Sequence, residues 1–132
     1  MSAMMTVTEN PATIEAARLW SQEFIDALSL ARHCAVADML KADPSSIIET
    51  ARKNAERWLA SGNYEDGESN SVREWLPLLA LEKRSDLIDV LTSESQNATR
   101  MRQSSPFTGI LPKPAYRMLR ERLIQEWSRH AA

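Results

Sequence analysis

Two pairs of adjacent residues hold the side chains that could act as nucleophile and base, His33-Cys34 and Ser104-Ser105. A thiol or hydroxyl nucleophile needs a base within hydrogen-bond reach and a third group that orients the base. On a helix, neighbouring side chains point about 100° apart, so the His33 imidazole cannot serve the thiol beside it. The two serines lack the Gly-x-Ser-x-Gly context of a nucleophile elbow. The sequence therefore predicts that the protein is not an enzyme, with a buried structural thiol at Cys34 and a surface imidazole at His33.

Metal ligands are also few. The sequence contains two histidines and one cysteine, with no Cys-x-x-Cys or His-x-x-x-His pair. Structural zinc sites use four Cys or His ligands at such short spacings. The sequence also has no glycine-rich loop of the kind that cradles phosphates. We expect neither a metal nor an organic cofactor.

The segment 100–114, RMRQSSPFTGILPKP, resembles neither an amphipathic helix nor an acidic loop. Two arginines one residue apart precede a polar triplet, a proline–phenylalanine step, a glycine and two further prolines. Arginine is favoured at interfaces and at phosphates, because its planar guanidinium binds two acceptors at once. Packing alone rarely requires such a connector in a short helical domain, so the segment indicates a functional surface.

We expect residues 100–107 and the basic last helix to bind a partner. The two arginines, which have no obvious local partner, would pair with acidic groups or a phosphate. The polar triplet would supply hydrogen bonds. The proline–phenylalanine step would fix the geometry, with its ring buried under the last helix. The candidate partner-binding residues are Arg100, Arg102, Gln103, Ser104, Ser105, Pro106, Phe107, Arg117 and Arg120.

Charge is unevenly distributed along the chain. The net charge is only −2, but residues 98–132 hold seven basic groups against two acidic ones. Such asymmetry indicates an acidic partner for the C-terminal part, or pairing between the two parts of the chain. Within the last helix, Arg117–Glu121 and Arg122–Glu126 have the i,i+4 spacing of local ion pairs. These pairs would neutralise part of the positive charge.

The fold class follows from composition and periodicity. The 132 residues are 43% hydrophobic, with three glycines and with abundant Ala, Leu, Glu and Arg, which favours helix. We predict an all-α fold, an irregular bundle of about five or six helices in a single domain over 10–132, after a flexible tail over 1–9. The tryptophans would anchor the core, with Trp20 as an exposed exception.

Start and stop signals place the helices. The first apolar repeat runs from 11 to 42, too long for a compact domain of this size, so we expect a break near Leu28–Arg32 or a projecting arm. Asp43-Pro44 begins the next helix and Gly62 ends it. Ser71 and Glu74 have capping-box spacing, and Ser85 can cap a further helix. The last two helices are expected over about 94–103 and from about 112–114 to 130.

Location follows from what the chain lacks. No apolar run approaches the roughly 18–20 residues of a membrane span, and the first residues do not resemble a signal peptide. A single cysteine excludes an internal disulfide and suits a reducing compartment. We expect a cytoplasmic protein with no membrane partner.

Two patterns carry a resemblance to short bacterial cytoplasmic proteins. The first is RMRQSSPFTGIL at 100–111, followed by a basic helix, and the second is Asp43-Pro44, Ala51-Arg52, Asn54 and Arg57-Trp58-Leu59. The chain resembles these all-helical proteins over about 28–124, and some of them look like the antitoxin of a two-gene toxin–antitoxin operon. The resemblance implies a protein partner, such as a toxin encoded nearby, and no catalytic residues. The chain departs from the usual antitoxin plan, because it lacks a DNA-binding ribbon or helix-turn-helix.

Three functions remain open at this point. The first is an antitoxin-like protein that binds and restrains a partner protein. The second is a nucleic-acid-binding transcriptional regulator that uses the basic C-terminal part. The third is an accessory subunit of an enzyme.

Overall fold

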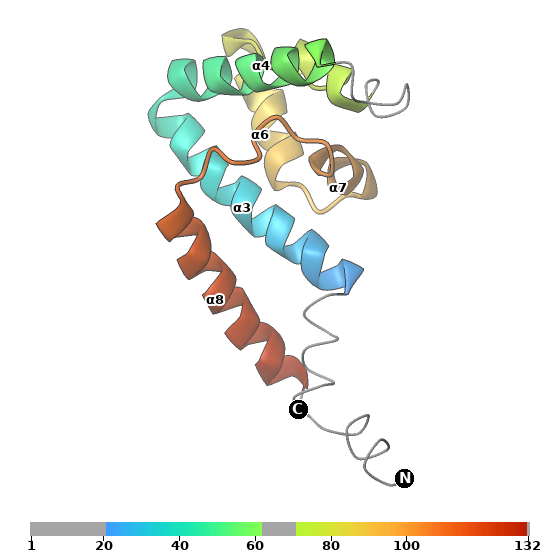
Figure 1. Ribbon diagram of the computed structural model, residues 1–132, viewed down its shortest axis with the longest axis vertical. Coiled ribbons are helices and arrows are strands. Elements are labelled where there is room, and N and C mark those ends of the chain that lie inside the picture. Colours follow the sequence, from blue (N-terminus) through green and yellow to red (C-terminus); the bar gives the residue numbers. More distant parts are fainter. Residues whose placement is uncertain (1–20, 62–70, 132) are drawn as a thin grey trace, which may run out of the picture.

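A computed structural model describes residues 21–61 and 71–131 of the chain (Figure 1). This part folds into helices packed around one core, and it contains no strand. The all-α fold predicted from the sequence is confirmed. The elements are α3 (Gln22–Ala42), α4 (Pro44–Ala60), the 3₁₀ helices η1 (Leu76–Leu78) and η2 (Leu81–Lys83), α6 (Arg84–Thr92), α7 (Gln96–Arg102) and α8 (Lys113–Ala131). The predicted tail over 1–9 and Trp20 lie outside the described residues.

Helix α3 runs without a break across the point where one was predicted. It begins at Ser21, whose hydroxyl accepts a hydrogen bond from the Phe24 N–H at 3.2 Å, and continues to Ala42. The predicted break near Leu28–Arg32 is therefore wrong, because this stretch contains neither glycine nor proline and its side chains continue the packed face. Residues 11–20, where the first apolar repeat begins, are outside the described part.

The turn between α3 and α4 is the one predicted. The Asp43 carboxylate caps α4 by accepting from the Ser46 N–H at 3.4 Å, and Pro44 is the first residue of the helix. Proline is favoured there because its missing N–H would have no partner within the helix. The predicted stop at Gly62 lies outside the described residues.

Two other predicted starts are wrong. The chain is helical only as far as Arg73, then turns and forms η1 around Pro77, which lacks the N–H that a continuing helix needs. Ser71 is itself helical and so does not stand before the first helical residue, and Glu74 is bonded to Arg100. Helix α6 begins at Arg84, directly after η2 and without a side-chain cap, one residue before the predicted cap at Ser85.

The last two helices match their predicted ranges. Ser95 caps α7, with its hydroxyl accepting from the Ala98 N–H at 3.1 Å, and the helix ends at Arg102. Helix α8 starts at Lys113 and reaches Ala131. In the described part of the chain, no helix is long and apolar enough to cross a membrane.

The core is formed by α3, α4, α6, α7 and the connector that follows α7. Its largest buried side chains are Trp75 and Phe107, whose ring centroids lie 5.7 Å apart at an interplanar angle of 61°. The prediction that Phe107 is buried is confirmed, but the ring packs against Trp75 in the core and not under the last helix. Among the other tryptophans that the structure describes, Trp58 and Trp127 are half-buried, so only Trp75 is a full core anchor.

Helix α8 lies along α3 at the edge of the body (Figure 1). The two helices meet through an edge-to-face contact of Phe24 with Trp127, at 5.5 Å between centroids, and through the Arg32 guanidinium over the Tyr116 ring. The connector, residues 103–112, crosses α3 on its way from α7 to α8. This crossing places the sequence-predicted site next to α3.

Candidate functional site

His33 and Ser105 form a buried hydrogen-bonded pair where the connector crosses α3. His33 has no exposed surface, so the prediction of a surface imidazole is wrong. Its Nδ1 lies 2.6 Å from the Ser29 carbonyl oxygen, which can only accept, so Nδ1 carries the proton. Nε2 then accepts from the Ser105 hydroxyl at 2.7 Å, and Ser105 Oγ accepts from the Phe107 N–H at 3.0 Å. Every polar atom of the pair is satisfied by a neutral imidazole.

This pair is an anchor for the connector. Burial lowers the pKa of His33 from 6.5 to about 4, opposed by the hydrogen bond to the Ser29 carbonyl and assisted by the charges of Arg32 and Arg102. A base this weak is poorly matched to removing a hydroxyl proton at neutral pH. The Ser105 side chain is also buried, in a residue only 2% exposed. The geometry therefore fixes position and is not arranged for nucleophilic attack.

Arg102 is an interior residue. It is 3% exposed, and its guanidinium donates to the Val90 carbonyl at 2.9 Å, to the Ser93 carbonyl at 2.7 Å and to Thr99 Oγ1 at 3.3 Å. Burial lowers the pKa of this guanidinium below its usual range. The prediction that Arg102 is an unpaired surface group is wrong, because the guanidinium bridges the end of α6 and the turn before α7.

Arg100 lies at the surface. Its guanidinium forms two hydrogen bonds with the Glu74 carboxylate, at 2.8 and 3.3 Å, and a third with Asn97 Oδ1 at 2.8 Å. The hydrogen bond that Arg100 donates to the Glu74 carboxylate raises the pKa of Arg100. The sequence search for nearby charges missed Glu74, which lies 26 residues earlier. The pair leaves about half of each side chain exposed, so a ligand can still reach Arg100.

The rest of the segment is held by backbone contacts. Pro106 and Phe107 are buried, the Asn54 side-chain amide donates to the Pro106 carbonyl at 3.0 Å, and the Trp75 indole N–H donates to the Met101 carbonyl at 3.0 Å. Gln103 is exposed and Ser104 is half-buried. Of the predicted residues 100–107, only Arg100, Gln103 and Ser104 therefore present side chains outside the core.

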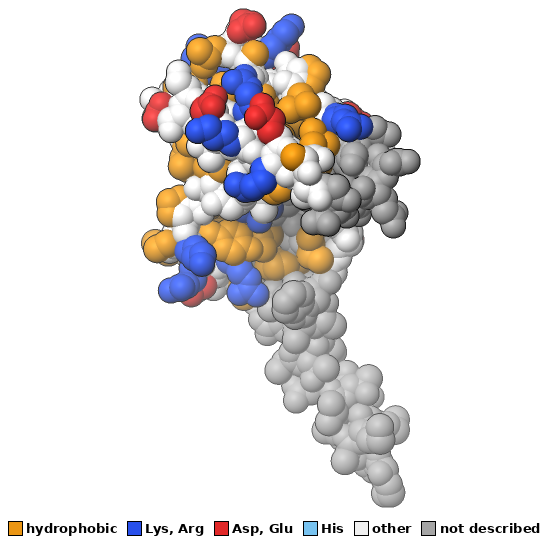
Figure 2. Space-filling view, turned by 45° about the horizontal axis from the view of Figure 1, so that its top comes forward, with side chains coloured by type: hydrophobic (Ala, Val, Ile, Leu, Met, Phe, Trp, Pro, Cys, Tyr) orange, Lys and Arg blue, Asp and Glu red, His pale blue; other side chains and the backbone are white. Residues whose placement is uncertain are grey.

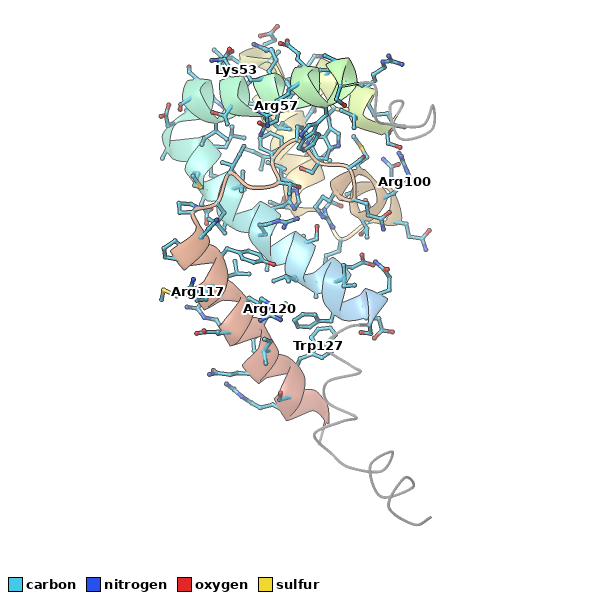
Figure 3. The ribbon with its side chains drawn as sticks, viewed as in Figure 1. Lys53, Arg57, Arg100, Arg117, Arg120 and Trp127 are labelled. Carbon is cyan, nitrogen blue, oxygen red and sulfur yellow. The ribbon has the colours of Figure 1, made fainter. Side chains whose placement is uncertain are left out.

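Arg117 and Arg120 lie on α8, away from Arg100. Figure 3 shows Arg100 on α7 and the two α8 arginines on the far side of α3. Arg117 is exposed and Arg120 is half-buried. The expected Arg117–Glu121 and Arg122–Glu126 ion pairs are not among those formed by residues 21–61 and 71–131. The structure thus splits the predicted surface into two parts that the connector joins.

Three clefts open along this connector, and Thr108 lines all of them. We name their combined surface the Thr108 groove. The first cleft, of about 430 Å³, is lined by Trp58, Ser71, Val72, Arg100, Gln103, Ser104, Ser105 and Thr108. The second, of about 370 Å³, is lined by Ile25, Asp26, Leu28, Ser29, Arg32, Arg102, Gln103, Thr108 and Tyr116. The third, of about 270 Å³, is lined by Arg32, Thr108, Gly109, Leu111, Lys113 and Tyr116.

The groove is basic and aromatic. Arg32, Arg100 and Lys113 line it together with the interior Arg102, against one carboxylate, Asp26. Two aromatic residues, Trp58 and Tyr116, line different clefts. Figure 2 shows a band of hydrophobic side chains on one face of the molecule, with Lys and Arg side chains below it and a mixture of Lys, Arg, Asp and Glu above it. Such a surface can hold anionic groups by charge-assisted hydrogen bonds while it buries apolar groups beside them.

Sequence reasoning missed several residues of the groove. Arg32, Thr108 and Tyr116 each have ordinary helical or turn spacing, and only the packing of α3, the connector and α8 brings them together. Asn54 and Trp58 belong to the second pattern that carried the resemblance, which was the one available signal for α4. The contact of His33 with Ser105 gives no signal in the sequence, because the two residues lie 72 positions apart.

In residues 21–61 and 71–131, no three His, Cys, Asp or Glu side chains come together in a group that could hold a metal ion. In comparisons with known proteins, no protein-family model matches the chain, no curated protein is similar to it, and no solved structure shares its fold at a significant level.

Proposed function

We propose that this is a non-catalytic binding protein that holds and restrains a partner protein at the Thr108 groove, in the manner of an antitoxin. The observation that carries the proposal is the anchored connector. The Ser105 side chain fixes it to α3, the Pro106 carbonyl to α4 and the Phe107 ring to Trp75, while Arg100, Gln103 and Thr108 remain at the surface. A segment held this firmly loses little conformational freedom when it binds, which favours affinity.

The groove chemistry supports an acidic partner segment with apolar side chains. Its cations outnumber its carboxylates, and Trp58 offers an apolar surface beside the guanidinium of Arg100 within one cleft. Arginine and tryptophan are the residues most often responsible for binding energy at protein interfaces. The resemblance noted in the sequence favours a toxin encoded nearby as the partner. An enzyme that the chain serves as an accessory subunit would engage the same surface.

Affinity measurements with the purified partner test the proposal. A tagged chain recovers the partner from the native cell, and calorimetry then gives its Kd for each variant. Arg100→Ala with Gln103→Ala should weaken binding at least about tenfold, since each removes an exposed donor from the first cleft. Lys53→Ala is the matched control, because Lys53 is a 72% exposed cation on α4 outside the groove. Equal affinity in the double variant and the control would reject the groove.

One observation favours a nucleic acid as the alternative partner. Lys113, Arg117 and Arg122 on α8 are exposed and form no ion pair with any residue that the structure describes. Binding to a phosphate backbone would weaken steeply as salt rises, whereas a partly apolar protein interface would weaken less. The overall charge of −2 favours the protein partner. Measuring the affinity of the complex at increasing salt concentrations distinguishes a nucleic acid from a protein partner.

A further inference from the structure

The cleft between α3 and the start of α8 has the features of an anion site. It encloses about 270 Å³, and its charged lining residues are two cations, Arg32 from α3 and Lys113 from α8. No carboxylate lines it. The rest of its wall comes from Thr108, Gly109, Leu111 and Tyr116, so one side is polar and the other apolar.

Arg32, which lines this cleft, has an unused donor. Its Nε is buried and has no hydrogen-bond partner in the part of the chain that is described. Buried donors without a partner are rare in native proteins, and one that persists calls for an explanation such as a ligand. The guanidinium is held 5.9 Å from the centroid of the Tyr116 ring, so its position is fixed by packing.

The charges of Arg32 and Lys113 are not neutralised locally. Neither residue takes part in an ion pair within residues 21–61 and 71–131. Asp26, the carboxylate in the adjoining cleft, accepts a hydrogen bond from the Gln22 amide at 2.8 Å and forms no ion pair with Arg32. Two cations from separate helices therefore face one small cleft without a counter-charge on its wall.

The backbone at Gly109 leaves space for a ligand. Gly109 has a φ of +88°, and a Cβ added to it would meet no atom within 4 Å. A side chain is disfavoured there by the backbone conformation and not by crowding. A ligand can consequently approach the main chain between the exposed Thr108 side chain and Lys113.

We propose that this cleft binds the phosphoryl group of a phosphate monoester. A dianionic phosphoryl group presents oxygens to the fork of Arg32, the ammonium of Lys113 and the hydroxyl of Thr108, while its substituent lies against Tyr116 and Leu111. The size of the cleft suits one phosphoryl group with a small substituent. The proposal goes beyond the proposed function, because it requires no partner protein.

Nuclear magnetic resonance with inorganic phosphate as the probe tests the site on the full chain. The Arg32 Nε–H signal and the Gly109 amide should shift saturably with phosphate at constant ionic strength, and acetate at equal concentration should give a much smaller change. The absence of a saturable shift at Arg32 would overturn the proposal. An equal response to acetate would overturn the preference for a phosphoryl group.

Variants separate the site from non-specific charge. Lys113→Gln, at an exposed position, should weaken phosphate binding about fivefold, and Arg32→Gln about tenfold or more. Lys53→Gln on α4 should bind as the wild type does. If all three variants bind phosphate equally weakly, the loss follows from the change in net charge, and the site is refuted. Because Lys113 is exposed, its variant remains informative if the Arg32 variant fails to fold.

Two further probes identify the source of the phosphoryl group. Phenyl phosphate stands for a small ester and an acetylated, amidated Gly-phosphoserine-Gly peptide for a phosphorylated protein. Tighter binding of either than of inorganic phosphate supports the site and assigns its ligand. Tighter binding of a thymidine dinucleotide, which carries one diester charge, would contradict the monoester proposal and favour nucleic acid. Loss of partner binding with intact phosphate binding would reject only the proposed function.

Discussion

The imidazole of His33 and the hydroxyl of Ser105 lie 2.7 Å apart in the interior, although 72 residues separate them in the chain. The contact joins the middle of α3 to the connector between α7 and α8. Because His33 also donates to the Ser29 carbonyl, its orientation is fixed from both sides. This neutral histidine is therefore one of the contacts that fix the Thr108 groove relative to α3.

Stability should fall as the pH drops from about 6.5 to about 4. The unfolded chain protonates His33 near its ordinary pKa of 6.5, whereas the folded chain resists protonation down to about 4. Unfolding thus takes up a proton in this window, and linkage predicts a loss of about 2 kcal/mol from this residue between pH 7 and pH 5. Urea unfolding at both pH values measures the loss.

A His33→Gln variant isolates this contribution from the carboxylates. Its stability should be lower at pH 7, and its additional loss on going to pH 5 should be smaller than that of the wild type. A direct check is the titration of the His33 ring by nuclear magnetic resonance. A ring that becomes half-protonated near pH 6.5 in the folded protein would contradict the buried, neutral assignment.

Replacing Arg102 by methionine should destabilise the fold, whereas replacing Arg100 by methionine should not. Arg102→Met leaves two buried carbonyls without their donor, so it should reduce the free energy of unfolding by about 3 kcal/mol. Arg100→Met removes a solvent-exposed pair with Glu74 and should leave stability nearly unchanged while it weakens partner binding. Chemical denaturation of both variants measures their free energies of unfolding. Equal stabilities would show that Arg102 is not an interior anchor.

Phe107→Ala should be strongly destabilising. The ring is fully buried against Trp75, and removing it leaves a cavity in the centre of the core. The expected loss is about 3 to 5 kcal/mol. Phe107→Leu, which keeps most of the volume, should cost much less. A small effect of the alanine variant would mean that the connector packs loosely and is not the rigid element proposed.

Cys34 should be a structural residue with low reactivity. Burial raises the pKa of its thiol, which keeps it protonated at neutral pH. Iodoacetamide should therefore alkylate the folded protein much more slowly than the unfolded protein. Cys34→Ala should bind the partner as the wild type does. Rapid alkylation of the folded protein, or loss of binding without loss of folding, would refute a purely structural role.

The existence of the helices was easier to predict from the sequence than the residues at which some of them begin. Helical periodicity placed α7 and α8, and the Asp43-Pro44 signal placed the start of α4. The predicted helix starts at Ser71 and Ser85 were wrong. Glu74 is bonded to the distant Arg100, and η2 continues directly into α6. Local signals carry no information about such distant partners.

The candidate site was predicted in position but not in its exposed residues. The segment 100–107 does border the groove, yet five of its eight side chains are buried. From sequence alone, an arginine that binds interior carbonyls, such as Arg102, is indistinguishable from one at the surface. Arg32 and Tyr116 were missed because only the packing of α8 on α3 places them in one cleft.

Site-specific photo-crosslinking tests whether the partner protein binds at the Thr108 groove. Benzoylphenylalanine is introduced in the native cell at Gln103, an exposed residue shared by two clefts of the Thr108 groove, and at Glu82, an exposed residue outside it, as the matched control. If the Thr108 groove holds the partner, one protein is captured from position 103 and not from position 82, and Arg100→Ala reduces its yield. Capture of the same protein from both positions, or of nucleic acid alone from position 103, would contradict binding of a partner protein at the groove.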